Sequence, residues 1–105
     1  MSKSQTITNP EWLHNPHAGE MLVSEFMEPL QLDSATLAKA IEVSTSDLDA
    51  VIEGLRAVSG DLDLRLARYF RMSEGFFLRL QTQYELLEAK RALNGALDRI
   101  VPRAA

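Results

Sequence analysis

The spacing of apolar residues along the chain predicts helices. After residue 18 the apolar side chains recur at intervals of three and four, and no useful stretch alternates with period two, as a half-buried strand would. Start and stop signals divide this pattern into five helices. We expect them from Gly19 to about Pro29, from Asp33 or Ser34 to Ile41, from Ser44 to about Gly54, from Gly60 to Phe70, and from Ser73 to Pro102 unless Gly95 ends the last one earlier.

A very short turn joins the second and third of these helices. Only Glu42 and Val43 separate them, which is the spacing of a helix-turn-helix. Ser44 begins the third helix with a capping box that Asp47 completes, and Gly54 is able to adopt a positive φ near its end. The sequence therefore predicts an all-α, compact five-helix bundle that contains a helix-turn-helix and has a longer C-terminal helix.

The length of the chain allows one domain. It has 105 residues, and residues 1–17 hold two of the four prolines, both histidines and the only tryptophan, without a sustained period. We expect an irregular N-terminal arm over 1–17, a helix-turn-helix domain with its C-terminal helix over 18–100, and a tail over 101–105.

The charge of the chain excludes a uniformly basic surface. Eleven basic and fifteen acidic residues give a formal charge of -4, so any contact with nucleic acid is expected to be local. Residues 32–58 hold two basic and five acidic residues, whereas residues 59–105 hold eight basic and six acidic ones. There is no cysteine, signal-like segment or membrane-length apolar run, so a cytoplasmic protein without disulfides or membrane contact is expected.

Catalysis, metal binding and cofactor binding find no support in the sequence. His14 and His17 are spaced like a metal pair, but no cysteine and no third histidine completes a ligand set. The serines are explained as helix caps, because none has the strand-turn-helix context of a nucleophile elbow. We expect no enzyme, no metal and no cofactor, and a contact of His17 at the start of the first helix.

Several longer segments match one family. They are Asn15-Pro16-His17-Ala18-Gly19-Glu20-Met21-Leu22, Glu25-Phe26-Met27-Glu28-Pro29-Leu30, Leu37-Ala38-Lys39-Ala40-Ile41, Val43-Ser44, Leu64-Arg65-Leu66-Ala67-Arg68-Tyr69-Phe70 with Ser73, Phe76-Phe77-Leu78-Arg79-Leu80-Gln81, and Tyr84-Glu85-Leu86. On these segments, which together span about seventy residues of the chain, the chain resembles the HigA-type antitoxins, a branch of the XRE-like (lambda-repressor-like) helix-turn-helix family. The resemblance implies an antitoxin, commonly dimeric, that neutralises a RelE-like mRNA interferase toxin and represses its own operon.

The chain departs from the family pattern at a few positions. Ala18 stands where proline is usual, and Glu42 and Arg71 stand at helix ends where glycine is favoured. A left-handed backbone at such a non-glycine residue costs roughly 1 kcal/mol. The recognition helix has the acidic run Thr45-Ser46-Asp47-Leu48-Asp49-Ala50 where arginine and glutamine are common.

The expected DNA contacts lie on the helix-turn-helix. They are Ser44, Thr45, Ser46, Asp49 and Ala50 in the recognition helix, with Lys39 and Arg56 at its flanks as phosphate contacts. An aspartate in the major groove can accept a hydrogen bond from a cytosine amino group, and a dimer would span two half-sites about 34 Å apart. The alternatives are a protein-binding antitoxin with weak or lost DNA binding, and a stand-alone transcriptional regulator.

Two further surfaces are expected to bind protein. The acidic N-terminal third suits a basic toxin, with Trp12, Leu13 and Glu20 as candidate contacts, although Trp12 folding back on its own domain is an equal alternative. The basic side chains Arg65, Arg68, Arg79, Lys90 and Arg91 form either a solvated face or a second toxin surface. Leu93, Leu97 and Ile100 have too little chain left to cover them, so we expect a homodimer through the last helix.

Overall fold

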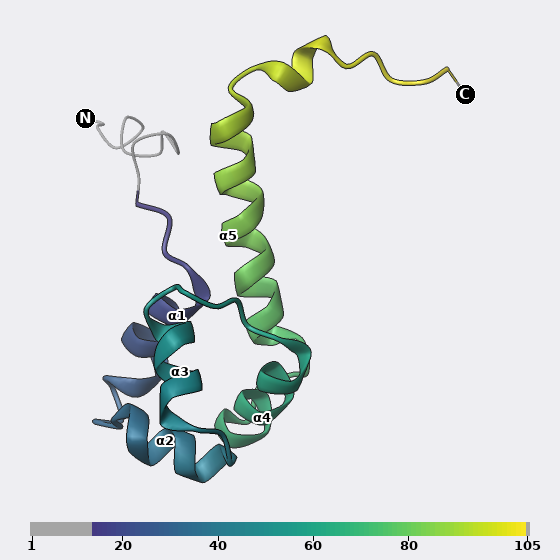
Figure 1. The fold of residues 1–105 in the computed structure, drawn as a ribbon. Helices are drawn as coiled ribbons and strands as arrows, with labels where there is room; N and C mark the ends of the chain where they lie inside the picture. Colours follow the sequence, from purple (N-terminus) through teal and green to yellow (C-terminus); the bar gives the residue numbers. More distant parts are fainter. Residues whose placement is uncertain (1–13, 105) are drawn as a thin grey trace, which may run out of the picture.

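A computed structural model describes residues 14–104 of the chain and is helical throughout (Figure 1). Within this range there are five α-helices and no strand, so the expected all-α class is confirmed. The elements are α1 (Ala18–Met21), continued by the π-helix η2 (Leu22–Met27), then α2 (Ser34–Ile41), α3 (Thr45–Ile52), α4 (Gly60–Phe70), α5 (Phe76–Leu93) and the 3₁₀-helix η3 (Ala96–Arg99).

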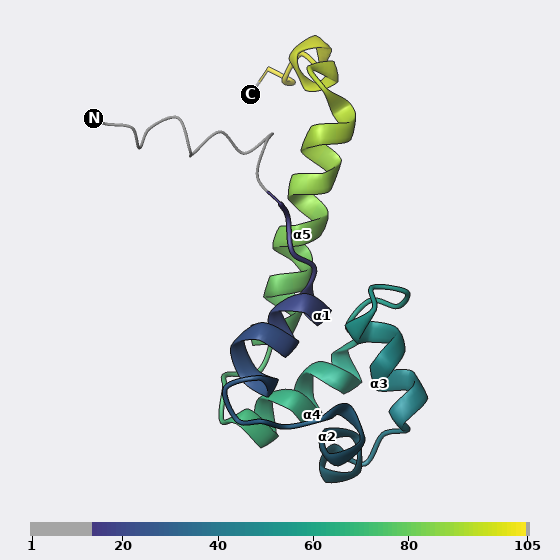
Figure 2. The same cartoon turned by 90° about the vertical axis from the view of Figure 1, so that its left-hand side faces the viewer.

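The helices divide into a bundle and a projecting arm. Helices α1 to α4 gather around the first turns of α5, and the rest of α5 extends away from them, with η3 and the C-terminus at its far end (Figures 1 and 2). Residues 14–17 run beside the middle of α5, where the Asn15 side chain donates to the Tyr84 carbonyl at 3.0 Å. Within residues 14–104, no helix is both long and apolar enough to cross a membrane.

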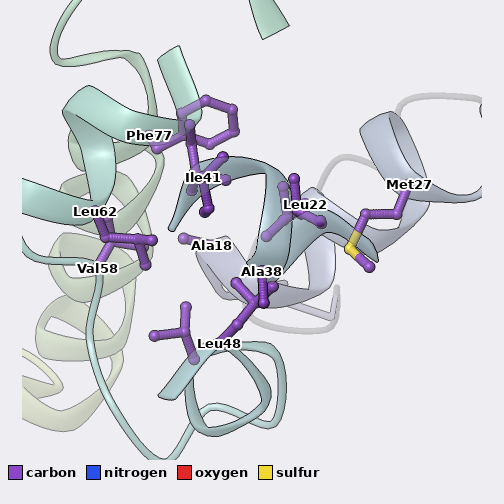
Figure 3. Close-up of a cluster of buried hydrophobic side chains, with 12 residues drawn as sticks. Ala18, Leu22, Met27, Ala38, Ile41, Leu48, Val58, Leu62 and Phe77 are labelled. Carbon is purple, nitrogen blue, oxygen red and sulfur yellow. The ribbon is translucent and has the colours of Figure 1, made fainter. Parts of the chain in front are cut away.

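The core draws side chains from every helix of the bundle. Figure 3 shows Leu22, Ala38, Leu48, Leu62 and Phe77 pointing toward one another from η2, α2, α3, α4 and α5. Burying a large apolar side chain contributes roughly 1.5–3 kcal/mol, so this cluster is the main source of stability. The remaining buried apolar residues are Ala18, Met27, Leu37, Ile41, Val51, Val58, Leu66 and Ala67.

An aromatic cluster joins the first helical segment to α4 and α5. The Phe26 ring lies 5.1–5.8 Å, centroid to centroid, from those of Phe70, Phe76 and Phe77. Tyr84, further along α5, lies edge-on to the His17 ring, with centroids 6.0 Å apart and planes at 82°.

The start of α5 is stabilised by a residue that the sequence pattern did not indicate. We expected Ser73 to cap this helix, but its first N–H groups donate to the carboxylate of Asp63 in α4, at 2.6 Å from Gly75, 2.7 Å from Phe77 and 3.0 Å from Leu78. The Ser73 hydroxyl accepts from Arg79 instead. Asp63 caps α5 in place of Ser73 because its buried carboxylate lies beside three N–H groups that have no acceptor within the helix.

Helix α5 ends well before Pro102. Asn94 and Gly95 both adopt left-handed conformations, with φ of 44° and 90°, and the chain turns into η3. Gly95 was the expected alternative end, and the physical reason is that glycine reaches positive φ without the clash of a β-carbon. The extension of the helix to Pro102 was wrong.

Candidate nucleic-acid interface

Local chemistry sets the two helices of the helix-turn-helix. Asp33 caps α2 by accepting from the Thr36 amide at 2.7 Å, and this hydrogen bond holds the pKa of the Asp33 carboxyl below its ordinary value. Glu42 ends α2 with a left-handed φ of 63°, and Ser44 then caps α3 by accepting from the Asp47 amide at 3.1 Å. The predicted tight turn is therefore present, with predicted residues at both N-caps. The expected capping box is incomplete, because the Asp47 carboxylate accepts from Arg56 instead of from the Ser44 amide.

A closely packed glycine fixes the position of α3 against α1. A β-carbon at Gly19 would lie 2.1 Å from the Val51 carbonyl oxygen and 2.8 Å from the Ile52 α-carbon, both backbone atoms of α3. The His17 ring caps α1, its Nδ1 accepting from the Gly19 and Glu20 amides. This is the helix-start contact that the sequence led us to expect at His17.

Arg65 of α4 binds the C-terminal end of α2. Its guanidinium donates to the Ile41 and Glu42 carbonyls at 2.8 and 3.2 Å and pairs with Asp61 at 2.6 Å. These carbonyls lie at the end of α2, where the last C=O groups of a helix have no N–H partner within the helix. The arginine therefore stabilises the turn before α3, a role that its position on a basic face did not reveal.

The exposed face of α3 contains most of the predicted DNA contacts. Leu48 and Val51 are buried beneath it. Thr45, Ser46 and the capping Ser44 are exposed, and so are the flanking Lys39 and Arg56, whereas Asp49 and Ala50 are half-buried. The structure thus brings the seven candidates to one helix-turn-helix unit.

An ion pair joins the first turn of α3 to the loop that follows the helix. The Arg56 guanidinium lies 3.1 Å from the Asp47 carboxylate, and both side chains are more than half exposed. The pair neutralises one acid of α3 but also occupies the cation that was expected to meet phosphate. Asp47 is thus a residue of the interface that the candidate set lacked.

Two of the three expected toxin contacts precede the described residues. Trp12 and Leu13 are outside the described residues. The Glu20 carboxylate is occupied by the His17 amide at 3.0 Å and by the His14 ring at 3.0 Å. The hydrogen bond from the His17 amide, followed by that from His14, lowers the pKa of the Glu20 carboxyl below its ordinary value.

The expected dimer contacts are exposed at the far end of the molecule. Leu93 ends α5, Leu97 lies in η3 and Ile100 follows it, with exposed fractions of 43%, 51% and 66%. They project beyond the bundle, on the part of the chain that extends away from it (Figure 1). Nothing within the described chain covers them.

His17 caps α1, whereas the His14 ring forms a hydrogen bond with the Glu20 carboxylate. Since Nδ1 of His17 accepts two backbone hydrogens, its Nε2 carries the ring proton in this geometry and has no lone pair for a metal ion. Within residues 14–104 there is no group of three or more metal-ligating side chains.

Comparison with known proteins finds close similarity along most of the chain. No family model matches it. Virulence-associated protein I of Dichelobacter nodosus is 38% identical over 74 residues, which are 70% of this chain and 68% of that protein. The solved structure of Pseudomonas aeruginosa antitoxin HigA with the higBA promoter has a TM-score of 0.77 and 33% identity, over 87% of this chain and 100% of that one. An addiction module antidote protein of a HigA family from Coxiella burnetii has a TM-score of 0.78 and 27% identity, over 87% and 100%. The likeness extends well beyond the helix-turn-helix itself.

Proposed function

Because this chain belongs to the HigA-type antitoxins of the XRE-like (lambda-repressor-like) helix-turn-helix family, we propose that it is the antitoxin of a type II toxin–antitoxin pair and the repressor of its own operon. The observation that carries the proposal is a capped and exposed α3, in a chain similar throughout to an antitoxin solved with its promoter. Its relatives are antitoxins and regulators rather than enzymes, and we propose no catalytic activity.

DNA recognition in this proposal uses few and weak contacts. The hydroxyl groups of Thr45 and Ser46 reach base edges singly, and Asp49 accepts from a cytosine amino group. Lys39 provides one phosphate contact, and Arg56 provides a second, weaker one because its ion pair with Asp47 competes with phosphate. With so few cations, binding is modest and falls as salt concentration rises.

A second candidate function is an antitoxin that binds its toxin but has weak or lost DNA binding. The observation that favours it is the charge of α3 and its end, where Asp47, Asp49 and Glu53 would approach a polyanion while Arg56 is paired. Repulsion between these carboxylates and phosphate lowers affinity at every DNA sequence.

The remaining parts of the proposal concern protein partners and location. The partner is a RelE-like toxin, and the acidic N-terminal region with Trp12, Leu13 and Glu20 offers charge complementary to a basic RNA-cleaving protein. The chain forms a homodimer through Leu93, Leu97 and Ile100, whose exposure on a projecting segment supports this role. It acts in the cytoplasm, where its operator and its toxin meet.

A mobility-shift assay tests the DNA-binding part. The probe is the DNA upstream of the operon of this chain, at low salt, with and without the purified toxin encoded beside it. We expect a complex that weakens when Lys39 and Arg56 are both changed to alanine, and not when the distant Arg99 is changed to alanine. Toxin binding without any shifted DNA, at low salt and in both conditions, would select the second candidate function.

A further inference from the structure

An open groove lies between the end of α2 and the outer face of α4. Its volume is about 780 Å³. Glu42 lines it from the end of α2, and Leu64, Arg68, Tyr69, Arg71 and Glu74 line it from α4 and the turn that follows, so its three arginines, Arg65 included, outnumber its two acids. None of the seven candidate DNA-contacting residues lines it. The groove is therefore a surface separate from the exposed face of α3.

Part of the groove wall is apolar. Leu64 and Tyr69 are large side chains that are 51% and 41% exposed. The Tyr69 ring lies edge-on to the Phe70 ring, with centroids 4.9 Å apart and planes at 85°. Exposed aromatic side chains beside aliphatic ones are enriched at the centre of protein–protein interfaces.

Two arginines in the groove lack an acidic partner. Arg65, one turn before Arg68 and Tyr69, is committed to Asp61 and to the end of α2. By contrast, Arg68 and Arg71 are exposed and form no ion pair within residues 14–104. A guanidinium offers a planar pair of donors that matches a carboxylate.

Arg71 keeps an unfavourable backbone conformation. It ends α4 with a φ of 60°, a region that glycine occupies without strain. The described chain has glycine at the positive-φ positions Gly54, Gly75 and Gly95, and other residues at Gln31, Glu42 and Asn94 as well as at Arg71. Replacing Arg71 by glycine therefore removes the guanidinium and relieves backbone strain at the same time.

We propose that this groove docks the toxin, through a segment that presents carboxylates beside an aliphatic or aromatic side chain. The proposal rests on the antitoxin function proposed above and adds a second toxin contact to that of the acidic N-terminal region: the N-terminal region faces the basic surface of the toxin, and the groove takes an acidic segment of it. A protein segment fits better than DNA because phosphate supplies no apolar group to cover Leu64 and Tyr69. Because the groove and the α3 face are separate, one molecule can hold toxin and operator together.

The test uses variants that remove the guanidinium groups without harming the fold. Arg71→Gly relieves the left-handed strain, so its thermal midpoint should be at least that of the unchanged protein. Its Kd for the toxin encoded beside this chain, measured by calorimetry, should be about tenfold weaker, and that of Arg68→Ala with Arg71→Gly about 100-fold weaker. The matched control is Glu42→Gly, which relieves the same strain at φ 63° in the same groove but removes an acid. It should bind toxin at least as tightly as the unchanged protein.

The other outcomes separate the two proposals. If the unchanged protein does not bind the toxin, the antitoxin function and this docking surface are both refuted. If the double variant binds it as tightly as the unchanged protein does, the docking surface alone is refuted. Weaker operator binding or smaller assemblies in the double variant, with unchanged toxin affinity, would instead assign the groove to DNA or to a second copy of the chain.

Discussion

Asp63 is the buried charged residue of the described chain, and its carboxylate holds α5 on α4. It is 1% exposed and accepts three backbone N–H groups from the start of α5. Each acceptor contact to a charged group contributes about 1.5–3 kcal/mol, and a buried donor left alone costs a similar amount. Asp63 therefore adds a polar anchor at the start of α5 to the apolar packing of Phe76 and Phe77.

We expect Asp63→Ala to lower the free energy of unfolding by about 3 kcal/mol or more, because three helix donors lose their acceptor. Urea denaturation followed by circular dichroism measures this change. The control is Asp61→Ala, which removes an exposed carboxylate two residues away and breaks only a surface ion pair with Arg65. Equal losses in the two variants would contradict the capping role.

Glu20 makes the folded protein less stable as the pH falls into the acid range. Its pKa is lowered in the folded chain, first by the His17 amide and then by the His14 ring, so the folded state holds its proton less tightly than the unfolded state does. The contribution of Glu20 to the free energy of unfolding is complete above the ordinary carboxyl pKa, and it is lost as the pH falls through the lowered pKa. Asp33, whose pKa is lowered by the Thr36 amide, acts in the same direction.

Glu20→Gln should therefore reduce the fall in thermal midpoint between about pH 5 and about pH 3, because part of the proton linkage is gone. Thermal unfolding at a series of pH values measures the slope. Glu28→Gln, which removes an exposed carboxylate just after η2, is the control and should keep the slope of the unchanged protein. A Glu20→Gln slope equal to that of the control would rule out this linkage.

At the scale of the element, α3 is a well-formed helix with an unsuitable charge for its proposed task. Ser44 caps it, Leu48 and Val51 anchor it, and Gly19 lets α1 approach its backbone. Its outer face nevertheless presents Asp47, and the nearby Arg56 is bound to that acid rather than left for phosphate. Packing holds α3 in place on the bundle, and the charge of its outer face limits its affinity for DNA.

Asp47→Asn should strengthen operator binding several-fold at low salt, because it removes a negative charge and releases Arg56. One added phosphate contact also makes the plot of log affinity against log salt steeper by about one unit. Fluorescence anisotropy at several salt concentrations measures both effects. Asp98→Asn in η3, far from α3, is the control, and equal behaviour of the two variants would show that Arg56 does not meet phosphate.

At the scale of the whole molecule, the bundle and the projecting end of α5 have different surfaces. The bundle encloses its own apolar residues, whereas Leu93, Leu97 and Ile100 are exposed along the projection. An apolar strip of this kind is typical of a contact with another subunit. Two copies joined there would carry two α3 helices, as a two-fold operator requires.

Leu93→Asp combined with Leu97→Asp should give a monomer at micromolar concentration, because charges would replace the apolar contact. Sedimentation velocity measures the mass, and affinity for a two-half-site operator should fall at least about tenfold as the avidity of the pair is lost. Leu30→Asp is the control, since Leu30 is 63% exposed but lies away from α5. A monomeric mass for the unchanged protein would contradict the dimer.

Short-range patterns in the chain predicted the number of helices, the tight turn and several of the caps. Asp33, Ser44 and the limits of α4 were predictable because capping and positive-φ turns involve residues within a few positions of each other. The exposed recognition face followed from the same periodicity, which buries Leu48 and Val51 and leaves their neighbours outside.

Only the tertiary structure decided which side chains meet across long distances in sequence. Asp63 replaces Ser73 as the cap of α5, Arg65 completes α2, and Asp47 takes Arg56 as its partner. In each case several donors or acceptors of similar chemistry compete, and packing selects the pair that lies at hydrogen-bond distance. Periodicity shows which way a side chain points, but its partner depends on which helix the core brings opposite to it.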